Sequence, residues 1–498
     1  MWYHTGDVVS CGMAGIAPPL VDREEELARL SELLVRPGAS LALITGRRRV
    51  GKTFLLGHAW PTSSTFLFTA TRTTPTQNRR QLILDLAAWS GDQLDPDDHP
   101  SWRSVFDLLW RCRAGQPLAI ILDEFQYLAA DEAGLAEVTS ALNATFERQR
   151  TDRPLVLALS GSAVSTLDAL ASGGAPLYGR LALHLRVDPL AVHHVAAFVP
   201  AWSARDVVAG YGVLGGTPAY WAQLDPDADL ADNVARLLLA RDGRLRQAID
   251  SLLLQEEGLG DPAAYTAIVR AIANGHVTRS RIADASGLKL DPSLVRRLER
   301  LVALGLVAIT PVEEAPRNAP VRYHLVDPAL RFHHAFVTPN ASLLERGDPA
   351  EVMRTVVAPR LDTFLGPAFE RLVAPTYDRL RQAAGWPMVL RWSRWEGVDR
   401  SQRSLEVDIV ATLVGGGVMT GAVKWNRRPL GVDVFAAHLD HVRRAADAGL
   451  RWAHAAAAGP LLFLTARGVD ERFAHAADAH PQPVITLTVE DVVAPPSA

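Results

Sequence analysis

The stretch "ITGRRRVGKTFLL", residues Ile44–Leu56, decides the fold of the first part of this chain. It contains the motif Gly-x-x-x-x-Gly-Lys-Thr, which begins at Gly46 and ends at Thr53. The preceding run "SLALIT" predicts a buried parallel strand, and the following "FLLGHAW" predicts a helix. A glycine-rich turn between a strand and a helix is the setting in which this motif cradles phosphate groups. We therefore predict an α/β domain with a P-loop and a parallel sheet.

The positions of this loop have separate chemical tasks. Glycines let the backbone turn tightly, so that successive N–H groups point at phosphate oxygens, and the helix N-terminus adds partial positive charge. Lys52 is expected to bridge the β- and γ-phosphates, and the Thr53 hydroxyl is expected to ligate Mg²⁺. The alternative is a chance match on a basic surface turn. The predicted nucleotide-binding residues are Gly46, Arg47, Arg48, Arg49, Val50, Gly51, Lys52, Thr53 and Phe54.

A second apolar run, "PLAIILDEFQYLA", supplies the acids that such a site needs. We expect a strand that ends in Asp123, which would hold the Mg²⁺ shell, and Glu124, which would orient and deprotonate the attacking water. The alternative is a strand that ends in two solvated acids. A third run, "PLVLALSGSAVSTL", brings Ser160 or Ser162 to the same edge of the sheet, to sense the γ-phosphate or to cap a helix.

The composition fits a chain of several globular domains. Its 498 residues are more than one ordinary hydrophobic core accommodates, so several domains are expected. Of these residues 48% are hydrophobic and 21% charged, as is typical of globular proteins. The net charge of −4 neither favours nor excludes a nucleic-acid partner. The two cysteines, Cys11 and Cys112, offer no disulfide framework or metal-ligand spacing, which suits a reducing cytoplasm. No apolar run approaches about 20 residues, so we expect no membrane span, and residues 1–19 are expected to be a loose leader, not a signal peptide.

The order of several motifs resembles one ATPase family. "VDREEEL", "GRRRVGKT", "ILDEFQYL", "LSGSAVS", "APLYGR" and "GGTPAYW" occur as in the archaeal-type ATPases, which belong to the STAND branch of P-loop ATPases related to the AAA+ class. The resemblance spans Leu20 to Leu239 and implies ATP as the nucleotide. It implies that Arg180 contacts the γ-phosphate, in its own chain or a neighbour, and that Pro218 in a helical lid lies against the base. Asp22, near the adenine by the same likeness, stands where the family usually has glycine. The alternatives are a surface arginine for Arg180 and a plain helix entry for Pro218.

The middle of the chain predicts a winged helix: three short helices followed by two strands. Asp291 or Ser293 is expected to cap the third helix. Between residues 278 and 301, six basic residues face three acidic ones. This excess would support contacts with DNA phosphates, but winged helices of STAND ATPases also pack on the nucleotide site, and both interpretations stay open. His333 and His334 are expected on a strand, as packing residues rather than metal ligands.

The C-terminal third resembles the PD-(D/E)XK nuclease fold and the domain of unknown function 234. The resemblance rests on a helix with Glu370, a strand with Asp408 and a strand with Lys424. Metal-dependent cleavage also needs an acid two positions before the lysine, and this chain has Ala422 there, whose methyl group cannot ligate Mg²⁺. We expect a degenerate domain retained for binding. Residual cleavage, or an Asp408–Lys424 structural pair in an unrelated α/β domain, are the alternatives.

Together these features predict a Mg²⁺-dependent ATP-hydrolysing switch of the cytoplasm, associated with DNA. The competing hypotheses are an ATP-gated metal-dependent DNA nuclease and a signalling or assembly ATPase with protein partners only. ATP and ADP are the expected ligands. The possible partners are double-stranded DNA, a second copy of the chain or another protein. No association with a membrane is expected. The predicted boundaries are 1–19 for the leader, 20–190 for the P-loop core, 191–258 for the lid, 259–345 for the winged helix and 346–498 for the nuclease-like domain.

Overall fold

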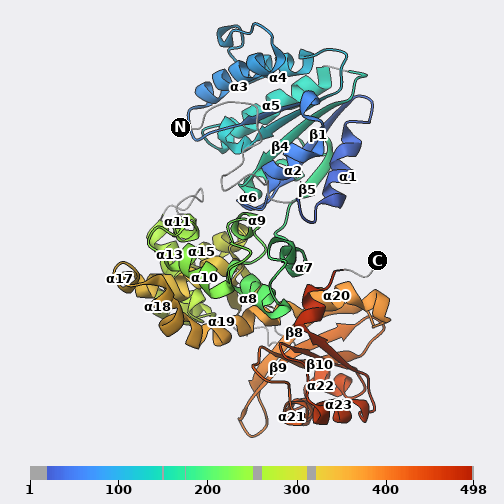
Figure 1. Ribbon diagram of the computed structural model, residues 1–498. Coiled ribbons are helices and arrows are strands. Elements are labelled where there is room, and N and C mark those ends of the chain that lie inside the picture. Colours follow the sequence, from blue (N-terminus) through green and yellow to red (C-terminus); the bar gives the residue numbers. More distant parts are fainter. Residues whose placement is uncertain are drawn as a thin grey trace. The chain divides into compact units, whose positions relative to one another are not determined.

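The computed structural model describes residues 20–148, 151–173, 175, 177–250, 261–310 and 321–495. The predicted leader therefore lies outside the described residues. The chain divides into two compact units (Figure 1). The first takes the chain up to Leu190 together with Thr217–Ala222, and the second holds the remainder.

The first unit is built around a parallel sheet of five strands in the order β2-β3-β4-β1-β5, so the predicted α/β class is confirmed. Figure 1 labels β1, β4 and β5 of this sheet. Its strands are β1 (Ala39–Thr45), β2 (Thr65–Thr69), β3 (Leu118–Asp123), β4 (Leu155–Gly161) and β5 (Leu181–Arg186). Its helices are α1 (Glu24–Leu33), α2 (Lys52–Ala59), α3 (Pro75–Ser90), α4 (Trp102–Arg111), α5 (Glu132–Arg148), α6 (Val164–Leu170) and α9 (Pro218–Trp221).

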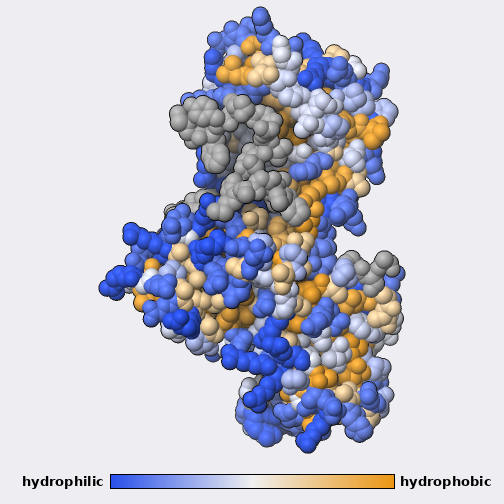
Figure 2. Space-filling view, viewed as in Figure 1, coloured by the Kyte–Doolittle hydropathy of each residue, from blue (hydrophilic) through white to orange (hydrophobic). Residues whose placement is uncertain are grey.

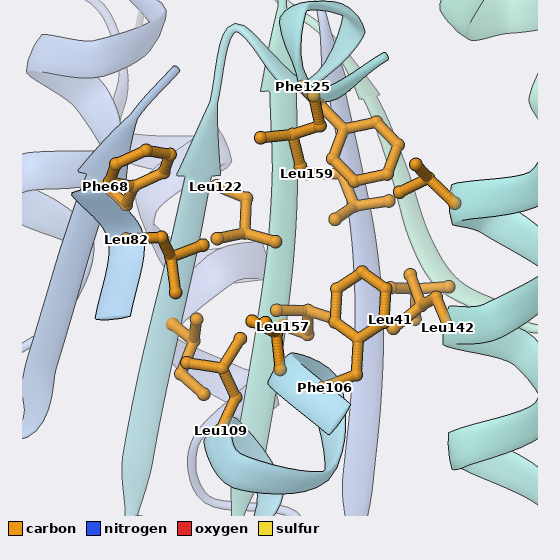
Figure 3. Packing of buried hydrophobic residues seen from close by; sticks show 14 of the residues in the cluster. Leu41, Phe68, Leu82, Phe106, Leu109, Leu122, Phe125, Leu142, Leu157 and Leu159 are labelled. Atoms are coloured by element: carbon orange, nitrogen blue, oxygen red, sulfur yellow. The ribbon is translucent and has the colours of Figure 1, made fainter. Parts of the chain in front are cut away.

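Successive residues of β1 face opposite sides of the sheet and pack against different helices. Leu41 and Leu43 join the cluster that holds the buried residues of α3, α4 and α5, including Phe106 (Figure 3). Ala42 and Ile44 join the cluster that holds the buried residues of α1 and α2. A strand that is buried on both faces reads as a continuous apolar run, which is why the sequence predicted it.

The register of the sheet gathers the polar strand ends at one edge. Thr45 at the end of β1 pairs with Gly161 at the end of β4. Asp123 at the end of β3 pairs with Thr69 at the end of β2. Because all five strands are parallel, the segments that follow these ends meet at the same edge, where ligands bind in open α/β sheets.

The helical part of the second unit contains the elements expected of a winged helix. Asp291 caps α15, where its carboxylate accepts hydrogen bonds from the backbone N–H groups of Ser293 at 2.8 Å and Leu294 at 3.2 Å. Two antiparallel strands follow, and residues 311–320 between them lie outside the described part. The elements are α13 (Pro262–Ala273), α14 (Arg279–Ser286), α15 (Pro292–Ala303), β6 (Val307–Thr310) and β7 (Arg322–Leu325). The other short helices of this part are α7 (Val192–Val195), α8 (Ala204–Leu214), α10 (Leu230–Val234), α11 (Arg244–Asp250), α16 (Pro328–Phe332), α17 (Ala341–Leu344) and α18 (Pro349–Val352).

The strand predicted for His333 and His334 is wrong, because both residues lie in a helical turn, His333–Val337. The segment is helical because Phe332 and Phe336, four residues apart, pack together with their ring centroids 5.0 Å apart. Both histidines are buried, and burial lowers the pKa of each to about 4.

The C-terminal part of the second unit is a mixed sheet in the order β12-β11-β10-β9-β8. β8, β9 and β10 pair antiparallel, and β10, β11 and β12 pair parallel. One face packs against α19 and α20 through residues such as Phe369 and Tyr377, and the other against α21 and α23 through Phe435 and Phe473. The strands are β8 (Val389–Val398), β9 (Ser404–Leu413), β10 (Val418–Lys424), β11 (Leu461–Thr465) and β12 (Val484–Thr488). The helices are α19 (Ala358–Glu370), α20 (Val373–Ala384), α21 (Val432–Asp447), α22 (Arg451–Ala456), α23 (Glu471–Asp478) and α24 (Val489–Val493).

The viewed surface of the protein carries hydrophilic residues with hydrophobic ones interspersed (Figure 2). Single exposed apolar side chains such as Leu390 on β8 contribute to the apolar surface, as in most globular proteins. Within the ranges that the structure describes, no helix combines the length and apolar character needed to cross a membrane.

A buried histidine makes the C-terminal sheet sensitive to acid. His438 on α21 lies with its Nε2 atom 3.1 Å from the Thr420 hydroxyl of β10. Burial lowers the pKa of His438 to about 4, and the charges of His441 and Lys424 act in the same direction against that of Asp408. The folded protein therefore keeps this ring neutral at pH values where an unfolded histidine takes up a proton.

We predict that His438→Gln reduces the loss of stability between pH 6.5 and pH 4. A lowered histidine pKa contributes stability that is present above the unfolded pKa and is lost as the pH falls toward the folded pKa. A shift from 6.5 to about 4 corresponds to roughly 3 kcal/mol. Urea unfolding followed at several pH values measures the effect, and His454→Gln, at an exposed position of α22, is the matched control. An equal acid-induced loss in both variants would contradict the assignment.

Candidate functional site

The backbone between β1 and α2 has the tight conformation that a phosphate cradle requires. Arg49 and Gly51 lie in the left-handed region, with φ of 68° and 94°. A Cβ atom at Gly46 would collide with the carbonyl oxygen of Val187, the residue after β5. Glycine is therefore required where the loop passes this backbone. Val50 is buried in the core beneath the loop, which anchors the turn.

Lys52 begins α2 and is almost fully buried, with 5% of its surface exposed. Its ammonium group donates hydrogen bonds to the backbone carbonyls of Gly46 at 2.8 Å and Arg47 at 3.0 Å. Burial lowers the pKa of Lys52, whereas the charges of Glu124 and Asp123 oppose this shift. The lysine is thus held at the loop and faces the two acids at the end of β3.

Asp123 connects three elements of the sheet edge. Its Oδ2 atom accepts a hydrogen bond from the Thr53 hydroxyl of α2 at 2.6 Å. Its Oδ1 atom accepts one from the Ser160 hydroxyl of β4 at 2.7 Å. A carboxylate and a hydroxyl in direct contact are oxygen ligands of the kind that Mg²⁺ prefers. The residues present therefore fit a magnesium ion bound next to the cradle.

Glu124 follows Asp123 in a left-handed conformation, with φ of 52°. Its Oε2 atom accepts hydrogen bonds from the Ser162 hydroxyl at 2.9 Å and from the side-chain amide of Gln126. Ser160 and Ser162 were predicted as alternatives, and the structure places Ser160 beside Asp123 and Ser162 beside Glu124. Gln126 was not predicted, although a polar residue inside the apolar run "FQYL" was a visible signal.

Two arginines meet a tyrosine beside the acids. The Tyr127 hydroxyl lies 2.7 Å from Arg48 Nη2 of the loop and 2.9 Å from Arg72 Nε, which follows β2. The charge of Arg48 also acts on Lys52 and disfavours its protonated form. Tyr127 and Arg72 were not predicted, because nothing in the sequence shows that these segments converge.

The remaining predicted nucleotide contacts lie at other positions of the first unit. Arg180 pairs with Glu147 of α5. Pro218 is the first residue of α9, which groups with the first unit and not with the helices around it in sequence. Asp22 has a φ of 53°, in the left-handed region that glycine adopts readily. Glycine is the residue that the resembling family usually has at this position. Phe54 is partly buried, with its ring centroid 4.4 Å from that of His58.

The structure brings together the three charged residues predicted for the nuclease-like site. Lys424 Nζ lies 2.8 Å from Asp408 Oδ2, which also accepts a hydrogen bond from the backbone N–H of Val423 at 3.0 Å. Glu370 lies at the end of α19. Burial raises its pKa, and the nearby charge of Asp408 raises it further. A residue that the sequence analysis overlooked, Arg394 of β8, adds a cation to this group.

Arg394 contacts three acids of the nuclease-like site. Its guanidinium lies 3.5 Å from Glu370 Oε2 and 3.7 Å from Glu396 Oε2, and it pairs with Glu406. Ala422 lies among apolar side chains that include Phe435 and Phe463, with 6% of its surface exposed. Among the residues with described positions, no group of three or more His, Cys, Asp and Glu side chains could hold a metal ion.

Comparison with known proteins identifies two segments of the chain. Residues 20–224 match the model of an ATPase domain found predominantly in Archaea. Residues 333–434 match a family of archaeal and bacterial proteins of unknown function, domain of unknown function 234. An uncharacterized protein of Methanocaldococcus jannaschii, MJECL04, is 26% identical over 400 residues, which cover 78% of this chain and 84% of the relative.

Solved structures with a related arrangement include two archaeal proteins. The Walker-type ATPase of Pyrococcus abyssi is 23% identical, with a TM-score of 0.46 and coverage of 64% of this chain and 96% of that one. The ORC2 protein of Aeropyrum pernix, solved as ADPNP–ADP complexes, is 18% identical, with a TM-score of 0.45 and coverage of 70% and 98%. The first part of the chain is thus similar to an ATPase domain found predominantly in Archaea, and part of its C-terminal third is similar to domain of unknown function 234.

Proposed function

We propose that the protein binds ATP with Mg²⁺ and hydrolyses it slowly, as a switch. The observation that carries the proposal is the meeting of four side chains at one sheet edge: Lys52, Thr53, Asp123 and Glu124. These residues combine a phosphate-binding cation, a pair of oxygen ligands and a carboxylate. Residues 20–224 also match the model of an ATPase domain, which supports hydrolysis and not binding alone.

Each of these residues has a distinct part in the proposed reaction. The backbone amides from Gly46 to Thr53 and the ammonium group of Lys52 bind the phosphates. Thr53 and Asp123 would hold a magnesium ion, which would neutralise phosphate charge. Glu124 orients the attacking water and accepts its proton. Arg180 would contact the γ-phosphate only after it leaves Glu147, because the pair engages its guanidinium.

We predict that Lys52→Ala and Glu124→Gln impair the reaction at different steps. Without the ammonium group, ATP binding or hydrolysis is lost, because the buried cation that is held at the loop and faces the two acids is removed. Without the carboxylate, ATP still binds, but turnover falls by about 10²-fold or more, as expected for loss of a general base. A fluorescent ATP analogue measures binding and phosphate release measures turnover. Glu137→Gln, on the exposed side of α5, is the control, and unchanged turnover in Lys52→Ala would reject the proposed cradle.

The winged-helix segment is the proposed DNA-binding element. Arg281 of α14, Lys289 of the following turn and Arg296 of α15 are exposed, and no ion pair involves them within the described ranges. Three unneutralised cations on a helix-turn-helix can contact phosphates. Packing of this segment on the nucleotide site would instead engage these side chains within the protein.

We predict that duplex DNA binds with a steep salt dependence that the triple variant Arg281→Ala, Lys289→Ala, Arg296→Ala reduces. Each lost phosphate contact lowers the slope of log affinity against log salt by about 0.9, so three contacts lower it by roughly 2.7. Fluorescence anisotropy across a salt series measures both slopes. The control replaces Arg29, Arg103 and Arg111, exposed residues of α1 and α4. Equal slopes in the triple variant and the wild type would exclude these contacts.

We propose further that the C-terminal domain is retained for binding and does not cleave DNA. The methyl group of Ala422 stands where a nuclease needs an acid. Lys424 neutralises Asp408 and Arg394 contacts Glu370, so that the acids already have cationic partners. This arrangement supports a nuclease-like scaffold without its metal.

We predict that Mn²⁺, added without nucleotide, shifts the unfolding midpoint equally in the wild type and in Asp408→Asn. A functional metal centre would lose its stabilisation with the aspartate. Differential scanning fluorimetry measures the shift, and prolonged incubation of plasmid DNA with Mg²⁺ or Mn²⁺ tests cleavage. A Mn²⁺ effect that disappears in Asp408→Asn, together with nicked plasmid, would favour the ATP-gated nuclease instead.

A further inference from the structure

Gln126 lies buried beside the proposed general base. It follows β3 in a short helical turn, Phe125–Leu128, and only 7% of its surface is exposed. Its side-chain nitrogen donates to Oε2 of Glu124, the same oxygen that accepts from the Ser162 hydroxyl. Within the part of the chain that the structure describes, no hydrogen bond to the other oxygen, Oε1, is formed.

The opposite end of the Gln126 amide explains its orientation. Oε1 of Gln126 is buried and has no hydrogen-bond partner among the described residues. It lies so close to Gly161 at the end of β4 that a Cβ atom there would collide with it. If the amide were turned around, a carbonyl oxygen would face a carboxylate oxygen. The contact with Glu124 therefore determines the orientation of the Gln126 amide, and it leaves the amide oxygen buried without a hydrogen bond.

We propose that Gln126 is a positioning residue for ATP hydrolysis, which rests on the function proposed above. Its amide and the Ser162 hydroxyl occupy Oε2 of Glu124 and leave Oε1 to accept a proton. The attacking water gives its proton to Oε1. Its oxygen forms a bond to the γ-phosphorus while the bond to the β–γ bridging oxygen breaks, and ADP leaves with that electron pair.

The Glu124 carboxylate needs these two hydrogen bonds because the backbone does little to fix its position. Glu124 has a left-handed backbone, which a glutamate rarely adopts. Its N–H donates a hydrogen bond to Asp123 Oδ1 at 3.0 Å, but among the residues with described positions the flexible side chain beyond the Cβ atom accepts hydrogen bonds from two donors alone, Gln126 and Ser162. Gln126 and Ser162 approach from β3 and β4, neighbouring strands of the sheet, so the carboxylate is fixed by the rigid part of the domain.

Gln126→Met tests the proposal directly. Methionine has nearly the same length but cannot donate a hydrogen bond, and it removes the unpaired buried carbonyl, so the unfolding midpoint should stay near that of the wild type. We expect kcat to fall about tenfold, while the affinity for a fluorescent ATP analogue changes less than about twofold. In the Glu124→Gln background the same substitution should have no further effect on kcat. Unchanged kcat in Gln126→Met, or an equal additional loss in the double variant, overturns the proposal.

Gln126→Glu adds a readout that a merely structural role would not change. At low pH the introduced carboxyl keeps its proton and can donate to Glu124 Oε2. At higher pH the introduced carboxylate cannot donate to Glu124 and repels it. Activity relative to the wild type should therefore be highest at acidic pH and fall as the pH rises. A pH profile of Gln126→Glu parallel to that of the wild type contradicts the proposal.

The outcomes separate this proposal from the function on which it rests. Wild-type turnover that survives Lys52→Ala rejects both the cradle and the role of Gln126. Turnover that is abolished by Lys52→Ala but normal in Gln126→Met rejects the role of Gln126 alone.

Discussion

The carboxylate of Asp123 is the interaction on which the proposed site depends. It joins the helix that follows the P-loop, through Thr53, to the strand that lies between the P-loop strand and the acidic strand, through Ser160. It also holds the N–H of Glu124. One buried side chain thus sets the relative positions of the three chain segments that would contact nucleotide, metal and water. This is possible because parallel strands in register end together.

The sequence predicted the parts of the molecule that depend on local pattern. The P-loop, the acidic strand end and the serines could be placed because buried parallel strands leave continuous apolar runs and their ends share one edge. Contacts between distant side chains leave no such pattern, so Gln126, Tyr127 and Arg394 were missed. The error at His333 has a related cause: a short apolar run does not distinguish a buried strand from a buried helical turn.

In the C-terminal domain, the structure gives Ala422 a packing role that the sequence did not reveal. From the sequence, Ala422 was a missing ligand. In the structure, it also belongs to an apolar cluster, and Arg394 lies among the acids that would otherwise repel one another. Burial, and after it the charge of Asp408, raises the pKa of Glu370, whereas the charge of Arg394 opposes this shift. The guanidinium of Arg394 thus supplies part of the positive charge that these acids need.

The left-handed backbone at Glu124 has a consequence for the stability of the domain. A glutamate in this conformation is less stable than a glycine or an asparagine would be, by about 1 kcal/mol. In the proposed site, the domain thus gives up some stability at the one position that would supply the general base, and its buried core compensates for this cost.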